Sequence, residues 1–168
     1  FERIPISDER QEAMLRKQID DLEMAIQSAR YEQDGGRYTV KQIEKTRKTL
    51  QTRLEKLNQK EKKDQVVTFE ELGVDHLYVD EAHSYKNAFL YTKMRNVAGI
   101  AQNEAQKSAD MFNKCQYLDE ITGGKGITFA TGTPISNSMT ELYVMQRYLQ
   151  NSKLQNMGLG LFDSWAST

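Results

Sequence analysis

The first third of the chain has the hydrophobic spacing of two helices that pack along a narrow seam. Its apolar residues recur at alternating steps of three and four, which is the heptad spacing of paired helices. The first run is Leu15, Ile19, Leu22, Ile26 and Ala29, and the second is Val40, Ile43, Arg47, Leu50, Leu54 and Leu57. The pattern predicts an antiparallel, coiled-coil-like helical hairpin over residues 8–63.

Capping and turn residues set the expected ends of these two helices. Ser7 is the expected N-cap of the first helix, and residues 34–36, Asp-Gly-Gly, are the expected turn. Thr39 with Gln42 has the spacing of a capping box, which predicts the start of the second helix. Charged helical faces are usually only solvated, which favours a structural spacer. The alternative is an arm that contacts DNA or a partner.

Beyond the hairpin, short apolar runs alternate with amphipathic segments. Residues 75–79 and 127–130 predict two short strands, and residues 108–121 predict a helix. Ser138 with Glu141 predicts the capped start of a last helix. Strands that alternate with helices predict an α/β fold, a parallel sheet with helices on both faces.

Weaker signals complete this half of the chain. Thr68 with Glu71 predicts a short capped turn of helix that stops at Gly73, residues 84–103 predict loop with some helix, and residues 151–168 predict a loop-like tail. The expected apolar faces are Met111, Phe112, Cys115 and Leu118 on one helix, and Leu142, Met145 and Leu149 on the other.

Composition narrows the class of protein. The 168 residues suffice for one ordinary domain, and the net charge of -1 gives no bulk argument for nucleic acid or a membrane. A single cysteine rules out a disulfide framework and fits a cytoplasmic setting. No apolar run approaches the roughly 18 residues of a membrane span. The chain starts with Phe, without a signal peptide, so we expect a piece of a longer protein.

Two acids at the end of the first predicted strand are the main candidates for chemistry. Asp80 and Glu81 directly follow the apolar run of residues 77–79, at the end of this predicted strand. Ligands of parallel sheets bind beyond the carboxyl ends of the strands, and Asp-Glu at such a place is the Walker B arrangement of nucleotide hydrolases. The alternative is that the acids only mark a helix N-terminus, where negative charge is favoured.

The residues around these acids resemble a known family. "DEAHSYKN" and, about fifty residues later, "TGTPISNSMTELY" resemble motifs II and III of the Swi/Snf-type branch of superfamily-two helicases. The resemblance spans residues 69–149 and implies a partial RecA-like lobe. It is closest to the helicase part of phage and conjugative-element proteins that join an adenine-specific DNA methylase to a motor.

The resemblance also implies a division of the chain. Residues 1–7 resemble the end of the segment that follows motif Ib, and residues 8–63 then form a hairpin inserted before motif II. Residues 64–150 correspond to the C-terminal half of the first RecA-like lobe, and residues 151–168 to a tail.

The resemblance implies a role for each motif II residue, with ATP and Mg²⁺ as cofactors and DNA as a partner of the complete protein. Asp80 corresponds to the Mg²⁺ ligand and Glu81 to the catalytic base that activates water. His83 corresponds to a link between motif II and motif III, the alternative being an interior histidine with a structural role.

The remaining implied site residues lie in two loops. Thr131, Gly132 and Thr133 correspond to the coupling loop of motif III. Lys86 and Asn87 suit contact with phosphate or with the partner lobe. From the residues alone, Gly132 and Pro134 indicate a tight turn, and the two threonine hydroxyls can bond to the backbone or to motif II.

A motor of this kind also needs a phosphate-binding P-loop, G-x-x-x-x-G-K-[ST], and the sequence lacks one. The cluster "TGGKGIT" precedes a strand, and its Lys125 is followed by Gly126, so it reads as an ordinary loop. The second lobe is missing as well. We therefore expect the chain alone to be inactive and to depend on the P-loop segment and remaining lobe of its parent.

Two other classes of function stay open at this point. The chain could be a non-catalytic interaction module, a helical hairpin on a degenerate nucleotide-hydrolase core. A nuclease or phosphatase that uses Asp80 and Glu81 as metal ligands is a weaker option, because further acids at metal-site spacing are missing. The incomplete sheet and the leucine seam also predict that the fragment self-associates.

Overall fold

The computed structural model describes residues 1, 3–31, 37–59, 66–88, 90–92, 94, 97 and 106–168. The chain forms two compact units. One unit is Ile6–Val66, and the other combines Phe1–Pro5 with Val67–Thr168. Among the described helices, none has the length and apolar character needed to cross a membrane.

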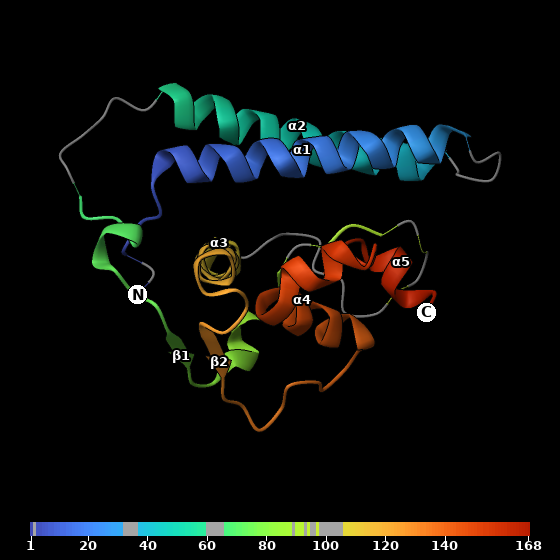
Figure 1. The fold of residues 1–168 in the computed structure, drawn as a ribbon. Helices are drawn as coiled ribbons and strands as arrows, with labels where there is room; N and C mark the ends of the chain where they lie inside the picture. The colour runs from blue at the N-terminus through green and yellow to red at the C-terminus, as the bar shows by residue number, and fades with distance from the viewer. Residues whose placement is uncertain are drawn as a thin grey trace. The chain divides into compact units, whose positions relative to one another are not determined.

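The first unit is a helical hairpin, as the heptad spacing predicts. Helix α1 spans Asp8–Tyr31 and helix α2 spans Arg37–Gln59, and the two lie side by side and antiparallel (Figure 1). Ser7 directly precedes α1, and its carbonyl oxygen accepts a hydrogen bond from the Gln11 N–H at 3.0 Å. The prediction that Thr39 caps the second helix is wrong, because α2 already begins at Arg37. The predicted turn at residues 34–36 lies outside the described residues.

The seam between α1 and α2 buries five of the predicted positions, whereas Leu15, Val40, Leu54 and Leu57 are half-buried and the Ala29 side chain lies outside the described part. The buried side chains of the hairpin are Ile19, Leu22, Ala25, Ile26, Ile43 and Leu50, together with Ile6 just before α1. Arg47, the polar member of the second run, places its Nη1 3.4 Å from Glu23 Oε1 on the other helix. A charged side chain at a seam position is therefore accommodated by an ion pair at the rim.

The second unit contains two strands and mostly short helices. Its elements in chain order are the 3₁₀-helix η1 (Glu70–Leu72), strand β1 (Leu77–Val79), the 3₁₀-helix η2 (Ala82–Tyr85), helix α3 (Gln106–Thr122), strand β2 (Ile127–Phe129), helix α4 (Met139–Asn156) and helix α5 (Phe162–Ala166). The predicted capping box before η1 forms only in part: Glu71 Oε2 accepts bonds from the Thr68 N–H at 2.7 Å and the Thr68 hydroxyl at 3.0 Å, but the cap position is Phe69, which makes no side-chain cap bond. Gly73 ends the turn with φ 64°.

The two strands pair in parallel, with Leu77 opposite Ile127 and Val79 opposite Phe129. Side chains at these positions pack toward the helices, whereas Tyr78 between them is 75% exposed. Successive residues of a strand point to opposite faces, so only one face of the sheet is covered. The prediction of helices on both faces is therefore wrong for the described part of the chain.

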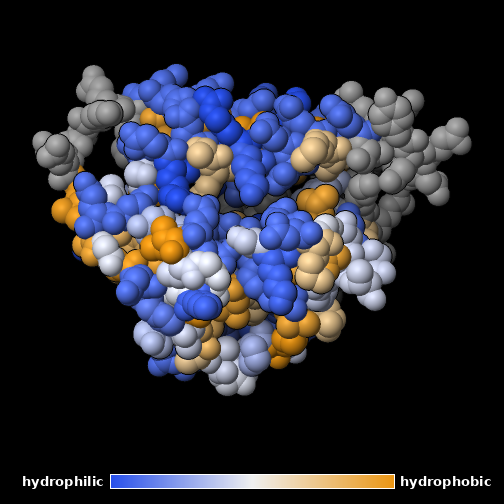
Figure 2. Space-filling model, in the orientation of Figure 1, coloured by the Kyte–Doolittle hydropathy of each residue, from blue (hydrophilic) through white to orange (hydrophobic). Residues whose placement is uncertain are grey.

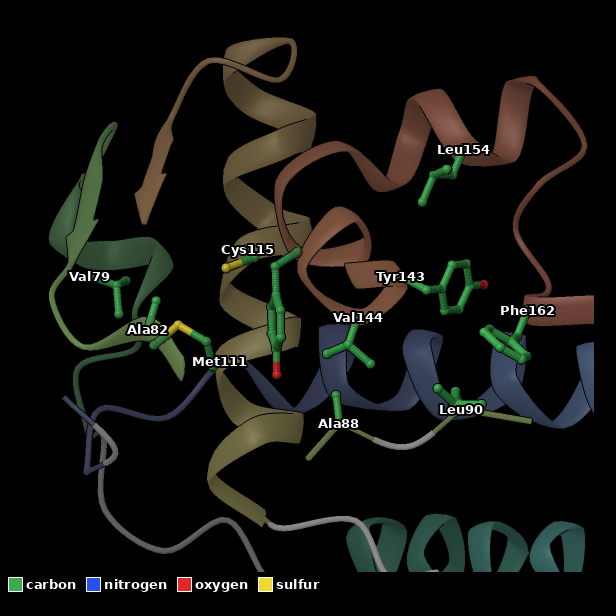
Figure 3. Close-up of a cluster of buried hydrophobic side chains, with 11 residues drawn as sticks. Val79, Ala82, Ala88, Leu90, Met111, Cys115, Tyr143, Val144, Leu154 and Phe162 are labelled. Carbon is green, nitrogen blue, oxygen red and sulfur yellow. The ribbon is translucent and has the colours of Figure 1, made fainter. Parts of the chain in front are cut away.

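The core of this unit lies between the covered face of the sheet and helices α3 and α4 (Figure 3). Met111, Cys115 and Leu118 are buried on the predicted face of α3. Burial first, and then the nearby charge of Asp119, raise the pKa of the Cys115 thiol. The single cysteine is thus a neutral core residue and not a nucleophile.

Two predictions for the C-terminal part are wrong. The buried face of α4 carries Tyr143, Val144 and Tyr148 beside the predicted Met145, whereas Leu149 is 36% exposed. Residues 151–168 are largely helical, since α4 runs on to Asn156 past a break at Gln150 and α5 follows. The helix α5 forms because its aromatic residues find a partner: Phe162 and Trp165 pack on the ring of Tyr143 at 5.4 Å between centroids.

The segment before the hairpin belongs to the second unit. The Phe69 N–H donates to the Pro5 carbonyl at 2.8 Å, so the chain leaves this unit and returns to it at adjacent points. Lys114 of α3 binds the N-terminal segment to this unit. Its fully buried ammonium donates to the Phe1 carbonyl at 2.9 Å and to Asp110 Oδ2 at 2.6 Å. The hairpin is thus an insertion whose two ends are fastened together.

The open sheet leads to a prediction about association. Within the described residues β1 and β2 each have one neighbour, so each leaves an edge that can pair with a second copy of the chain. We expect concentration-dependent oligomers in sedimentation velocity at micromolar concentration. Thr128→Lys on the exposed face of β2 should shift the distribution toward monomer, since lysine on an edge strand opposes pairing.

The control for this experiment is Thr52→Lys on the exposed face of α2, which adds the same charge away from the sheet. It should leave the distribution unchanged. A wild-type chain that sediments as a single monomer over the whole concentration range would contradict the prediction. Oligomers that persist after Thr128→Lys would indicate that the copies associate through the hairpin seam and not through the sheet.

Candidate functional site

The carboxyl ends of the two strands bring the two predicted motifs together. The Ala130 N–H donates to the Val79 carbonyl at 2.8 Å, and the Ala82 N–H donates back to the Ala130 carbonyl at 3.1 Å. These bonds extend the parallel pairing beyond β1 and β2. The segment that begins at Asp80 and the loop that begins at Thr131 therefore leave the sheet side by side.

The acidic pair at the end of β1 has an unusual backbone. Glu81 has φ 52° and ψ 42°, and it is the only described residue other than glycine with a positive φ. This left-handed conformation costs about 1 kcal/mol or more for a residue with a Cβ. Asp80 Oδ1 accepts the Glu81 N–H at 2.8 Å, which offsets part of this cost. Both side chains are exposed, as a ligand site requires.

His83 joins the two motifs directly. Its Nδ1 lies 3.0 Å from Thr131 Oγ1 and 3.1 Å from Glu81 Oε2. A carboxylate only accepts hydrogen bonds, so this arrangement favours the tautomer or charged form with a proton on Nδ1. His83 is half-buried, in contact with both loops, and does not serve as an interior core histidine.

The Thr-Gly-Thr loop is held by its first residue. Thr131 Oγ1 accepts the Thr133 N–H at 3.2 Å, in addition to its contact with His83. Gly132 and Thr133 are exposed. A Cβ added at Gly132 would meet nothing within 4 Å, and its φ is not positive, so the described chain itself does not require glycine there.

Lys86, predicted to contact phosphate or the partner lobe, is engaged within the chain. Its ammonium donates to Ser136 Oγ at 2.8 Å and to Glu141 Oε2 at 3.2 Å, and the two charged side chains are 10% and 12% exposed. This geometry favours a brace between the η2 segment and the start of α4 over a direct contact with a ligand. Asn87, its predicted companion, is exposed.

Glu141 does not complete the predicted capping box with Ser138. Its carboxylate instead accepts the N–H groups of Ser136 at 2.6 Å and Asn137 at 3.3 Å, while the Ser138 side chain accepts the Thr140 N–H. Desolvation alone would raise the pKa of Glu141, but these backbone hydrogen bonds and Lys86 outweigh it and lower that pKa. Glu141 is therefore an anion that fixes the loop before α4.

Tyr148 is a positioning residue that the sequence pattern did not reveal. Its ring is fully buried, 5.5 Å from the ring of Phe129 on β2, and its hydroxyl lies 3.0 Å from the Tyr85 carbonyl and 3.1 Å from the Ser108 carbonyl. The hydroxyl can donate to either carbonyl. Tyr148 thus fixes the end of η2, and with it the segment of Asp80 and Glu81, against α3.

The carboxylates fit only one kind of metal site. Within the described residues, no group of three or more Asp, Glu, His or Cys side chains could enclose a metal ion. Mg²⁺ in nucleotide sites is held by one or two carboxylates together with substrate phosphates, and an exposed Asp80 suits that arrangement. A nuclease-type or phosphatase-type cluster of acids finds no support in this part of the chain.

Comparison with known proteins shows the family of the chain. The family described as "Probable helicase domain" matches residues 1–168. The chain is also 32% identical over 104 residues to Defense against restriction protein B of Escherichia phage P1, which covers 59% of the chain and 4% of that relative. No solved structure matches. Because the family model spans all of the chain, the protein belongs to the probable helicase domain family.

Proposed function

We propose that the chain is the part of an ATP-driven DNA helicase or translocase that carries motifs II and III of a first RecA-like lobe, of the Swi/Snf-type branch of superfamily two. The observation that carries the proposal is the contact of His83 with both Thr131 and Glu81 at the carboxyl ends of paired parallel strands. Membership of the helicase domain family supports the same class of function.

Each site residue then has a role that follows from its position. Bound ATP would supply the phosphoanhydride bond that is cleaved, and Mg²⁺ would supply positive charge that neutralises the phosphates of ATP. Asp80 would hold the ion, and Glu81 would take a proton from the attacking water. Any shift of Glu81 would be transmitted through His83 to Thr131, so the nucleotide state would change the Thr131–Thr133 loop.

The loop would pass this signal to whatever lies next to it in the complete protein. Gly132 supports this role, because the described chain gives no steric or conformational reason for a glycine there. A residue without a Cβ lets another group approach the backbone closely. Lys86 and Glu141 would keep the loop and the acidic segment in register while this happens.

The phage origin of the similar protein bears on the kind of parent protein to which the chain belongs. The P1 protein is a phage protein named for defence against restriction, and the chain spans only about 4% of its length. We propose that the chain is likewise a small part of a large protein of a phage or mobile element. An attached adenine-specific DNA methylase is part of this proposal, and the parent gene on either side of the chain tests it directly.

ATP hydrolysis by the chain and by its parent tests the proposal. The full-length protein should release phosphate in a DNA-stimulated manner, whereas residues 1–168 should show no release above background with or without DNA, because their sequence contains no P-loop. A full-length protein without DNA-stimulated hydrolysis would contradict the proposed motor and favour a non-catalytic interaction module. Release by the isolated chain that Glu81→Gln abolishes would contradict its dependence on the missing segments.

A further inference from the structure

A row of lysines covers the outward face of helix α2. On a helix of 3.6 residues per turn, the members of this row fall within an arc of about 80°, opposite the buried Ile43 and Leu50. The row extends for about 22 Å at 1.5 Å per residue. The members of this lysine row are Lys41, Lys45, Lys48 and Lys56, all of them exposed.

The ammonium groups of the lysine row differ from other cations of the hairpin in their partners. Elsewhere in the hairpin, Arg16 pairs with Glu12 at 2.6 Å and Arg47 with Glu23 at 3.4 Å. Within the described part of the chain, no ion pair involves an ammonium group of the lysine row. Glu55 is exposed at the margin of the row, and Glu44, three residues after Lys41 and four before Lys48, is half-buried. The row therefore presents four positive charges to solvent along one side of α2.

The two helices of the hairpin differ strongly in charge. Helix α1 contains six acidic and four basic residues, whereas α2 contains two acidic and seven basic residues. The face of the hairpin that Figure 2 shows is predominantly hydrophilic, so the contrast there is one of sign and not of polarity. A hairpin that served only as a solvated spacer would gain nothing from concentrating its cations on one side of one helix.

We propose that the lysine row binds the phosphate backbone of nucleic acid without reading its sequence. Lysine is a flexible point charge that suits phosphate contact more than base recognition. A DNA strand offers a phosphate about every 3.4 Å, so a row of 22 Å faces roughly six of them. Nucleic acid is favoured over other polyanions because the chain belongs to a helicase domain family.

The lysine row is a contact surface outside the proposed nucleotide site. Its assignment rests on the proposed function only in the choice of nucleic acid as the polyanion. Nucleotide hydrolysis and DNA binding by the lysine row are measured in separate experiments. Loss of hydrolysis after Glu81→Gln together with unchanged binding would support both, whereas a failure of either one leaves the other measurable.

The test compares the wild-type chain with a variant in which Lys41, Lys45, Lys48 and Lys56 are all changed to Gln. Binding to fluorescent 20-mers, double-stranded and single-stranded, is followed by anisotropy without nucleotide between about 30 and 200 mM salt. We expect the variant to bind duplex at least about tenfold more weakly at low salt. The slope of log K against log salt should decrease by about three to four, since each lost phosphate contact removes about 0.9.

A second variant controls for total charge. Lys17, Lys107, Lys125 and Lys153 are exposed on other elements, and changing all four to Gln removes the same four charges. It should bind within about threefold of the wild type and keep its salt slope to within about one. Circular dichroism should show unchanged helicity in both variants, since glutamine is nearly as good a helix former as lysine.

Three results would overturn the proposal. Equally weakened DNA binding in the two variants would show that total charge, and not the lysine row, determines the affinity. No binding of either 20-mer by the wild-type chain at about 30 mM salt would exclude nucleic acid as the partner. Preferential binding to vesicles of phosphatidylcholine with phosphatidylserine, lost only in the lysine-row variant, would assign the row to a membrane surface instead.

Discussion

Glu81→Gln in the full-length protein is expected to lower ATP turnover by about 10²- to 10⁴-fold, the usual contribution of a general base. ATP binding should stay largely intact, since glutamine keeps the shape of the side chain and removes only its basicity. Glutamine can also occupy the same left-handed backbone and stay within reach of His83 Nδ1. Steady-state phosphate release and nucleotide binding, measured on the same samples, separate the two effects.

The neighbouring acid should behave differently. Asp80→Ala removes a carboxylate with which Mg²⁺ would interact, so it should weaken Mg²⁺-dependent nucleotide binding in addition to turnover. Asp75→Asn is the matched control, because Asp75 is an exposed acid just before the opposite end of β1. It should leave both quantities near the wild-type level. Normal turnover by Glu81→Gln would show that another residue is the base.

The elements predicted well from the sequence are those fixed by local patterns. The heptad spacing places Ile19, Leu22 and Ile43 in the hairpin seam because helical periodicity decides which side chains share a face. The two strands and their parallel pairing follow from short apolar runs separated by a helical segment. The meeting of His83 and Thr131 follows in turn, since parallel strands bring their carboxyl ends to the same edge.

The features that the sequence pattern missed depend on contacts between distant residues. Glu141 has the spacing of a capping box, but the N–H groups of Ser136 and Asn137 and the ammonium of Lys86 give its carboxylate more bonds than the box would. Tyr148 is buried because the η2 segment, 63 residues earlier, offers a carbonyl to its hydroxyl. No local rule distinguishes these partners from solvent.

The prediction of a loop-like tail over residues 151–168 was wrong for a similar reason. Its composition is polar and contains glycine, which favours a loop in the absence of a partner. Tyr143 on α4 supplies the surface on which Phe162 and Trp165 pack, and Thr92 bonds to Asp163 from a distant loop. Short helices gain most of their stability from such tertiary packing and little from propensity.

No sequence pattern predicted that Lys114 is buried. Lys114→Ala is expected to destabilise this unit by about 3 kcal/mol or more. Lysine is almost never fully buried unless it is paired, and here its ammonium satisfies Asp110 and the carbonyl of Phe1. It also lies 4.2 Å from the ring centroid of Phe1 and 5.7 Å from that of Phe69. The alanine variant would leave a cavity and would take the ammonium away from the Asp110 carboxylate and the Phe1 carbonyl.

Urea unfolding followed by the fluorescence of Trp165, the single tryptophan, reports on this unit alone, because Trp165 packs on Tyr143 and Phe162. Lys114→Met should lose less stability than Lys114→Ala, since methionine refills the space between the rings and lacks only the charge. Lys107→Ala, an exposed lysine on the same helix, should change the free energy of unfolding by less than about 0.5 kcal/mol. An unchanged midpoint for Lys114→Ala would mean that the bonds of Lys114 to Phe1 and Asp110 contribute nothing to the stability of this unit.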